Sequence, residues 1–242
     1  MSTLFISDLH LDLNNPALIQ LAVDFLSSTA TQCDALYILG DLFNVWLGDD
    51  LIPNEFTPVI EQLQKLHQQG IKTYLMVGNR DFMMGIDFAQ LAGCELLDDH
   101  CVIDLYGIKT LLLHGDTLCT DDIAYQRYRL WSRNKLLQWF FRHMPLKFRQ
   151  NLADKIKQQS RQQKQTKSTM IMDVNADEVA RIMIKFGVTQ LVHGHTHRPA
   201  VHILKISDKP ATRIVLGDWQ NKVSYLQCDK KGSQLFDYRV MT

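Results

Sequence analysis

Apolar runs with the period of strands alternate with helix-periodic runs in the first part of the chain. The strand-like runs TLFIS, ALYILG and TYLMVG are separated by segments whose apolar residues recur every three or four positions. The first such segment opens at Pro16 and places Leu18, Leu21, Ala22 and Phe25 on one face. This order of strand, helix and strand predicts an α/β fold with a parallel sheet.

The pattern changes twice further along the chain. CVIDL and KTLLLHG meet at Tyr106 and Gly107, a pair typical of a hairpin turn, so the sheet is predicted to be mixed. From about 121–170 strand character disappears and amphipathic helix takes over, with a break at Pro145. We interpret 121–170 as a helical cap inserted into a single domain that spans 1–242.

The last third of the chain returns to strands after one more helix. Asn175 is the expected N-cap of that helix, with Glu178 three residues on and Gly187 at its end. The runs AVHILKI, TRIVLG, VSYLQC and QLFDYR then predict four short strands separated by turns.

Composition places the chain among globular proteins of the cell interior. Its 242 residues are 46% hydrophobic, enough for a packed core. Five cysteines, an odd number without a C-x-x-C pair, argue against a disulfide framework. The opening MSTLFISDLH lacks a basic leader, and no apolar run nears the ~18 residues of a membrane span, so we expect neither a signal peptide nor a transmembrane segment.

Charge is unevenly distributed although the formal net charge is zero. Residues 127–167 hold twelve of the 26 Lys and Arg residues but a single acidic residue, Asp154. This basic segment lies within an acidic remainder, which suggests a partner with an anionic surface.

Candidate chemistry gathers where the apolar runs end. In QLVHGHTHRP, His195 and His197 follow an apolar run at alternating positions, and alternating side chains of an extended chain point to the same side. We therefore expect the two imidazoles to converge on a metal ion. Four other apolar runs also end in polar residues of ligand type: Asp8, His10, Asp41, Asn79 and His114.

Taken singly, each of these residues has an ordinary structural explanation as a helix cap, a turn residue or a hydrogen-bonded core histidine. Their recurrence at five strand ends favours one site, because the carboxyl ends of strands meet at one edge of a sheet. Seven nitrogen and oxygen ligands are too many for one ion. Two ions about 3.5–4 Å apart would need a bridging ligand, and a carboxylate can bridge where an imidazole cannot.

At this point the chain resembles the calcineurin-like metallophosphoesterases, whose signature is D-x-H, G-D, G-N-[HR]-[DE], H and G-H-x-H. All five blocks occur here in order. The resemblance implies an αββα sandwich of mixed sheets with two divalent metal ions. It further implies that Asp8, His10 and His197 hold one ion, that a second set holds the other, and that Asp41 bridges them. The second set is Asn79, His114 and His195.

One departure from the signature bears on the reaction. Many members carry His after the Asn of G-N, whereas this chain has Arg80. A guanidinium cannot act as a general acid at neutral pH, but it suits a bidentate clamp on phosphate oxygens. The leaving group should then need little protonation, and a phosphate, with a second pKa near ~6, meets that condition. Arg80 therefore indicates cleavage of a pyrophosphate bond.

The GNRDF block, the length and the basic insertion resemble one family in particular, the UDP-2,3-diacylglucosamine diphosphatases of lipid A biosynthesis. This resemblance implies attack on the α-phosphorus by a hydroxide held between two ions, usually Mn²⁺, releasing UMP and 2,3-diacylglucosamine 1-phosphate (lipid X). It implies catalytic roles for Asn79, Arg80 and His195 and a peripheral location at the cytoplasmic side of the inner membrane. The implied substrate contacts are Asn79, Arg80, Asp122, Ser160, Lys164, Lys167 and His195.

The insertion interleaves Trp and Phe residues with basic ones, a composition typical of helices that lie on anionic membranes or cover an apolar groove. Ordinary packing of a helical cap accounts for part of the pattern. Stacking of the aromatic residues on nucleic-acid bases is the rival interpretation, although we expect no nucleic-acid partner. A metallophosphodiesterase of nucleotides, a phosphomonoesterase and a non-enzymatic metal-binding scaffold remain as alternatives.

Overall fold

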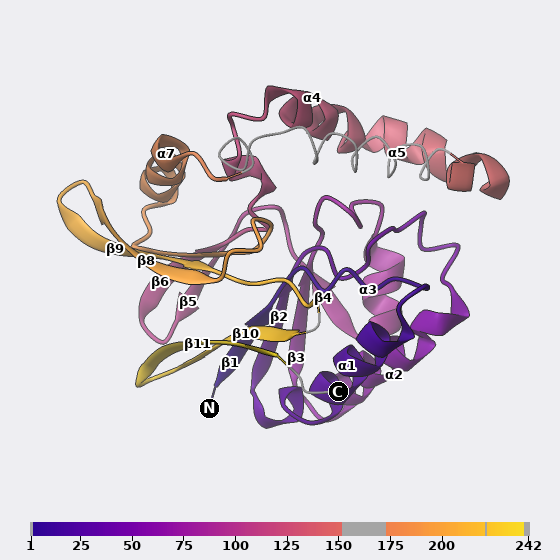
Figure 1. The fold of residues 1–242 in the computed structure, drawn as a ribbon, viewed down its shortest axis with the longest axis horizontal. Coiled ribbons are helices and arrows are strands. Elements are labelled where there is room, and N and C mark those ends of the chain that lie inside the picture. The colour runs from indigo at the N-terminus through magenta and orange to yellow at the C-terminus, as the bar shows by residue number, and fades with distance from the viewer. Residues whose placement is uncertain (1, 152–172, 221, 240–242) are drawn as a thin grey trace.

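The structure is a computed structural model that describes residues 2–151, 173–220 and 222–239. Two β-sheets pack face to face, and helices cover the outer face of each, which confirms the predicted αββα sandwich (Figure 1). The packing differs from a single open sheet, because the predicted strands divide between two sheets.

The first sheet has six strands in the order β11-β10-β1-β2-β3-β4. Strands β1 to β4 run parallel to one another, and β10 and β11 form an antiparallel hairpin beside β1. The strand bounds are β1 Thr3–Ile6, β2 Ala35–Leu39, β3 Lys72–Met76, β4 Cys94–Leu96, β10 Lys222–Asp229 and β11 Gly232–Arg239.

The second sheet has five strands in the order β5-β6-β7-β9-β8. The predicted hairpin is confirmed as the antiparallel pair β5 and β6, with both Tyr106 and Gly107 in left-handed conformations at its turn. β7 lies parallel to β6 and β9, and β8 closes the edge in antiparallel pairing with β9. The strand bounds are β5 Cys101–Leu105, β6 Ile108–Leu112, β7 Gln190–His193, β8 Ala200–Ile206 and β9 Lys209–Val215.

Helices bury their apolar faces on the outer sides of the two sheets. Three helices pack against the first sheet, and one packs against the second. Their bounds are α1 Pro16–Ser27, α2 Thr57–Gln68, α3 Ile86–Ala92 and α7 Ala176–Phe186. The predicted caps are confirmed: Asn15 caps α1 ahead of Pro16, Asn175 caps α7, and Gly187 ends α7 with a φ of 60°.

Between the sheets lies a third apolar layer, built from residues such as Phe5, Leu39, Leu112, Val192 and Ile214. Since each central strand contributes residues to this layer and to an outer layer, the strands have little polar surface along their length. The polar side chains of ligand type on the central strands are therefore found at the strand ends.

Two helices cross the end of the sandwich where β1, β2, β3 and β6 finish (Figure 1). They are α4 Ile123–Ser132 and α5 Lys135–Arg142, and residues 146–151 are also helical. The break at Pro145 is confirmed, but a second break at Asn134, which caps α5, was not predicted. Short 3-10 turns complete the described elements: Ala30–Gln32, Asn54–Phe56 and Asp116–Leu118.

All five cysteines are free, as their odd number indicated. No helix among the described residues is long and apolar enough to cross a membrane.

Candidate metal centre and active site

The seven predicted metal ligands lie together where strands from both sheets end. Asp8 and His10 follow β1, Asp41 follows β2, and Asn79 follows β3 in the first sheet. The second sheet contributes the remaining side chains from the ends of β6 and β7: His114, His195 and His197.

One group of donors consists of Asp8, His10 and His197. Nε2 of His197 lies 3.3 Å from Oδ1 of Asp8 and 3.1 Å from Nε2 of His10. One ligand atom from each of the three residues lies within 4.8 Å of the others, close enough for all three to reach a single ion.

A second group is centred on Asn79. Its amide oxygen lies 3.0 Å from Nε2 of His114 and 2.8 Å from Nδ1 of His195. The rings of the two histidines meet edge to face with their centroids 5.1 Å apart. The structure thus brings together the same three residues that the resemblance placed on a second ion.

Asp41 lies between the two groups. Its Oδ2 is 3.7 Å from Nδ1 of His10 and also 3.7 Å from Nε2 of His114. Its other oxygen accepts a hydrogen bond of 2.7 Å from the backbone N–H of Arg80. One carboxylate oxygen is therefore equally near both groups, as a bridging ligand requires, and the division of ligands between two ions stays a prediction.

Strained backbone conformations are concentrated at these ligands. Asp8, His10, Asp41, His195 and His197 all have positive φ angles, between 51° and 69°. Few residues other than glycine adopt this region, and such conformations gather at functional sites.

This finding corrects our reason for pairing His195 with His197. The chain is not extended after β7 but turns sharply, with the N–H of Thr196 bonded to the carbonyl of Gly194. The two side chains therefore enter the site through left-handed turns rather than through strand alternation, and they join different donor groups, His195 with Asn79 and His197 with Asp8. His193, the first of the three histidines, is a buried core residue whose Nδ1 bonds the carbonyl of Gly194 at 2.8 Å.

Buried charge sets the protonation of this cluster. Burial raises the pKa of Asp41 to about 7, whereas the pKa of Asp8 is held well below its usual range, because its close contact with His197 and the charge of His114 outweigh burial. Burial alone would lower the pKa of His114, but the charges of Asp41 and Asp8 raise it to about 9. Burial lowers the pKa of both His10 and His195 to about 3, so these imidazoles are neutral, the form that binds metal.

The donor set fits divalent cations. Oδ1 of Asp8 and Nδ1 of His10 are buried without a hydrogen-bond partner in the described part of the chain, an arrangement that is costly unless another group satisfies them. Imidazole and carboxylate donors together suit Mn, Fe and Zn ions. A protonated His114 brings one positive charge next to two buried carboxylates, those of Asp8 and Asp41. Divalent cations would bring additional positive charge to the same carboxylates.

Comparison with known proteins agrees with this geometry. The family model described as calcineurin-like phosphoesterase matches residues 1–199, most of the chain. The chain belongs to the calcineurin-like phosphoesterases.

Curated relatives of this phosphoesterase match nearly end to end. UDP-2,3-diacylglucosamine hydrolases of Pseudomonas entomophila and Pseudomonas aeruginosa are each 49% identical to it over 232 residues, covering 96% of this chain and 97% of theirs. The protein of the same name from Azotobacter vinelandii is 47% identical over 240 residues, covering 99% of this chain and all of that one.

Sequence reasoning missed Asp81 as a member of the site of this phosphoesterase. Its buried carboxylate accepts hydrogen bonds from the backbone N–H groups of Gly78 at 2.7 Å and of Asp41 and Phe43 at 3.3 Å each. Asp81 thereby ties the loop after β3 to the loop after β2. The only signal available was its place directly after Asn79 and Arg80 in the G-N-R-D block.

Two further carboxylates, Asp116 and Asp218, contact groups around the candidate ligands. The buried carboxylate of Asp116 accepts hydrogen bonds from the Tyr125 hydroxyl at 2.7 Å and from Nε of Arg129 at 2.8 Å. Asp218 lies 3.7 Å from Nδ1 of His197 and 3.3 Å from the Lys222 ammonium.

Some basic side chains of the cap form ion pairs within the molecule. Arg129 pairs with both Asp116 and Asp99, and Arg149 pairs with Asp50. The charge asymmetry of the sequence therefore reflects, in part, attachment of a basic cap to an acidic core rather than an external anionic partner alone.

The predicted substrate contacts divide into three sets. Asn79, Arg80 and His195 belong to the cluster already described. Asp122 is the N-cap of α4 and accepts a hydrogen bond from the N–H of Tyr125. Ser160, Lys164 and Lys167 lie outside the described residues, and all seven contacts stay predictions.

Proposed function

We propose that this chain hydrolyses the pyrophosphate bond of UDP-2,3-diacylglucosamine at the α-phosphorus, releasing UMP and lipid X. The proposal rests on the convergence of seven metal-ligand side chains from five strand ends of both sheets. It is supported by the near-complete matches to relatives named UDP-2,3-diacylglucosamine hydrolase.

Two divalent ions, which we propose to be Mn²⁺, would be held by the two donor groups with Asp41 between them. When bound, such ions supply Lewis-acid activation of water and neutralise charge on a phosphoryl group at neutral pH. The contribution of the protein is positional. Asp8 and Asp41 have their second oxygens fixed by backbone N–H groups, those of His195 at 2.8 Å and Arg80 at 2.7 Å, so each offers one oriented oxygen to a cation.

Arg80 is proposed to orient the phosphoryl oxygens. The charge of its guanidinium lowers the pKa of both His10 and Tyr128 of α4, opposing in Tyr128 the rise caused by burial. Its planar fork can donate two parallel hydrogen bonds to phosphate oxygens. Asn79 and His195, which bond each other, would face the same phosphoryl group.

Hydrolysis in water enriched in heavy oxygen is expected to place the label in UMP. Attack at the α-phosphorus adds the water oxygen to the phosphorus that stays on uridine, so lipid X should remain unlabelled. Mass spectrometry of both products, from Mn²⁺-loaded protein and UDP-2,3-diacylglucosamine, measures this. Label in lipid X would show attack at the β-phosphorus and would contradict the proposal. Dinucleotides and single-stranded DNA, tested in parallel, should not be cleaved at a comparable rate.

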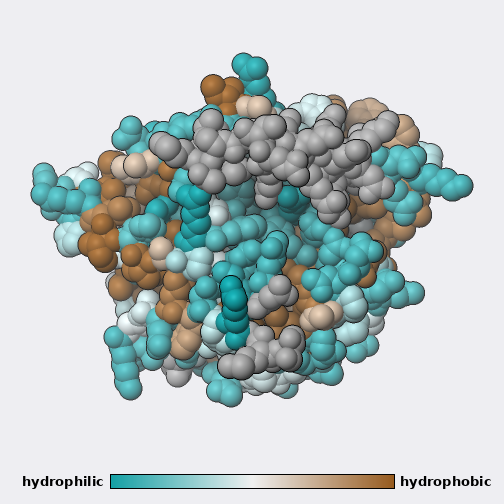
Figure 2. Space-filling view, in the orientation of Figure 1, coloured by the Kyte–Doolittle hydropathy of each residue, from teal (hydrophilic) through white to brown (hydrophobic). Residues whose placement is uncertain are grey.

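We further propose that the cap holds the protein on the anionic inner membrane at its cytoplasmic side. Large apolar side chains of α4 and α5 are exposed, among them Leu130, Trp131, Leu136, Trp139 and Phe140. In Figure 2 hydrophobic atoms gather at the upper right edge, over α5. Exposed aromatic residues interspersed with basic ones favour the surface of an anionic bilayer.

Replacing Trp139 and Phe140 together with alanine is expected to weaken binding to anionic vesicles about tenfold or more, because each buried aromatic side chain contributes ~1.5–3 kcal/mol. Flotation with phosphatidylglycerol-containing vesicles measures this, and neutral phosphatidylcholine vesicles are the lipid control. A matched control variant is Ile203→Ala, which removes an exposed apolar side chain from β8, far along the chain from the cap. Equal binding of both variants would argue against the cap as the membrane contact.

A further inference from the structure

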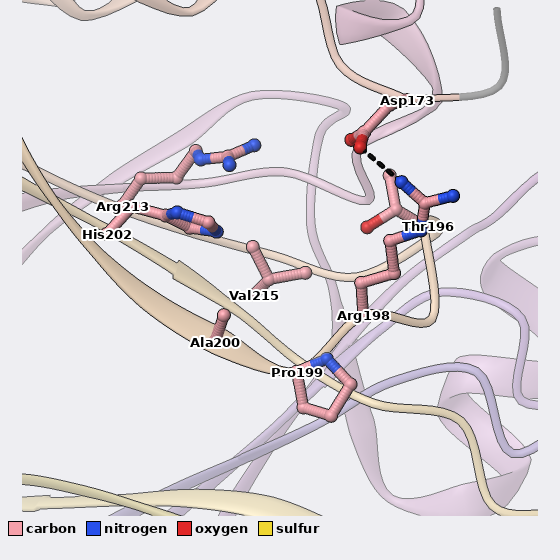
Figure 3. Close-up of a pocket in the computed structure, with 8 residues that line it drawn as sticks. All are labelled: Asp173, Thr196, Arg198, Pro199, Ala200, His202, Arg213 and Val215. Carbon is pink, nitrogen blue, oxygen red and sulfur yellow. Dashed lines mark hydrogen bonds and ion pairs between the residues drawn. The ribbon is translucent and has the colours of Figure 1, made fainter. Parts of the chain in front are cut away.

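A cavity of about 200 Å³ lies on the outer face of the second sheet, beside the segment that leads into α7 (Figure 3). Ile214 of β9 points into the layer between the sheets, so its neighbours Arg213 and Val215 project to the outer face. The facing residues of β8 are paired in register with them, His202 with Arg213 and Ala200 with Val215. These four side chains form the base of the cavity.

The guanidinium of Arg213 is the unusual feature of this cavity. Its Nη1 is buried and has no hydrogen-bond partner in the described part of the chain. Burial lowers the pKa of Arg213, although the charge of Asp173 acts in the opposite direction. The nearby thiol of Cys119 offers no countercharge, because burial raises its pKa to about 12.

A buried guanidinium nitrogen without a hydrogen-bond partner is costly unless a ligand accepts from it. Burial lowers the pKa of His202, and the charge of Arg213 lowers it further. Both effects favour a neutral imidazole next to the guanidinium. The base of the cavity thus offers hydrogen-bond donors that aim at an acceptor.

The rim of the cavity joins it to the candidate metal centre. Thr196, which lies between the ligands His195 and His197, lines the cavity together with Arg198, the residue after His197. Nη1 of Arg198 contacts Oδ2 of Asp173 at 2.5 Å across the rim, as the dashed line in Figure 3 shows. A substrate bound at the metal centre could therefore extend into the cavity past Thr196.

We infer that this cavity receives the uracil ring of the substrate, an inference that rests on the proposed function. Uracil presents two carbonyl acceptors on either side of one N–H donor. Arg213 and Arg198 can only donate hydrogen bonds and Asp173 can only accept them, so the lining holds both types of group that the edge of uracil requires. Ala200 and Val215 supply an apolar surface for the ring face.

The size of the cavity and the place of the other predicted contacts agree with this assignment. Whole small-molecule sites usually enclose about 300–1,000 Å³, so a cavity of about 200 Å³ suits one part of a larger ligand. The predicted substrate contacts outside the donor groups and Arg80 all belong to the cap segment 121–170: Asp122, Ser160, Lys164 and Lys167. The nucleoside half requires a different place, beyond the metal centre.

Calorimetric titration of the Mn²⁺-loaded full-length protein with UMP and with CMP tests the inference. The wild type is expected to bind UMP more tightly than CMP, because cytosine lacks the ring N–H donor and one of the carbonyl acceptors. Arg213→Met should lose ~10-fold or more of the UMP affinity and the preference over CMP, and should raise the KM for UDP-2,3-diacylglucosamine. Arg181→Met, which removes an exposed arginine from α7, is the matched control.

The outcomes separate this inference from the proposed function. If the wild type hydrolyses UDP-2,3-diacylglucosamine but Arg213→Met and Asp173→Asn both keep its UMP affinity and preference, the cavity does not bind uracil. If affinity for inorganic phosphate falls as much as affinity for UMP, the cavity is only an anion site, and the uracil assignment is wrong. Failure of the wild type to cleave the lipid substrate would overturn the proposed function instead. Arg213→Lys, which keeps the charge but loses the fork, replaces Arg213→Met if that variant does not fold.

Discussion

Replacing Asp41 with alanine is expected to lower kcat/KM for UDP-2,3-diacylglucosamine by about 1,000-fold or more, and to lower the metal content below two ions per chain. The reason is the position of this carboxylate, whose Oδ2 lies 3.7 Å from a nitrogen of His10 and of His114. Among the described residues Asp8 also has an oxygen within 4.8 Å of ligand atoms of His10 and of His114, but its Oδ1 lies closest to His197 of the first donor group, at 3.3 Å. Elemental analysis and steady-state kinetics measure the two effects.

The fold should survive this substitution. Asp41 accepts one hydrogen bond, from the backbone N–H of Arg80, and Asp41→Asn keeps an oxygen at that place while removing the negative charge. Both variants should therefore retain the circular dichroism spectrum of the wild type. Asp24→Ala, which removes an exposed carboxylate on α1, is the control for nonspecific loss of charge. Two ions retained together with normal turnover would remove the assignment of Asp41 as a bridge.

The sequence predicted most of the fold because its local signals and its tertiary structure agree. The hairpin at Tyr106 and Gly107 and the helix between Asn175 and Gly187 formed where the turn and capping residues indicated. β4 was missed, since three residues are too few to show a period. The break between α4 and α5 was missed because Asn134 stands inside a continuous basic amphipathic pattern.

The sequence indicated which side chains gather at the site, whereas it did not indicate their backbone geometry. Histidine, aspartate and asparagine at the ends of five apolar runs form a rare combination that indicates a site from residue type alone. Their left-handed backbone conformations leave no periodic signal, because such strain is set by the close contact of loops from two sheets. Gly194 shows this contact: a Cβ added there would lie 2.1 Å from the hydroxyl of Ser7.

Supporting residues could not be predicted for a related reason. Asp81 bonds backbone groups as many as forty residues away, and backbone groups carry no identity in the sequence. Arg213 stands in an ordinary strand pattern, and only the packing of β8, β9 and the segment before α7 leaves its guanidinium buried beside a cavity. Long-range polar contacts of this kind become visible only when the chain is folded.

The cap and the strand-end site are joined through the contacts of α4. Asp116, two residues after His114, binds Tyr125 and Arg129 of α4. Nη2 of Arg133 donates a hydrogen bond of 2.9 Å to the carbonyl of Gly78, directly before Asn79. α4 is therefore attached to the loops that carry ligands of the second donor group.

Replacing Asp116 with alanine is accordingly expected to destabilise the protein by about 2–3 kcal/mol, because it leaves the mostly buried guanidinium of Arg129 with one of its two carboxylate partners. It should also lower hydrolysis of both UDP-2,3-diacylglucosamine and a small chromogenic phosphodiester, about tenfold or more, since the His114 loop and α4 lose their common anchor. Denaturant unfolding and parallel assays of the two substrates measure these effects. Asp24→Ala again serves as the control.

Variants at the exposed aromatic residues of the cap should affect the two substrates differently from Asp116→Ala. Trp139→Ala with Phe140→Ala should depress turnover of the diacylated substrate through lost apolar contact, while the small phosphodiester is hydrolysed as before, because neither side chain contacts the donor groups. Arg133→Ala should behave like Asp116→Ala, since it removes the support of the Gly78 carbonyl. If Asp116→Ala and Arg133→Ala, folded by circular dichroism, affect only the lipid substrate, α4 serves substrate selection alone. Equal losses on both substrates would instead make α4 the element that holds the metal-ligand loops in their working positions.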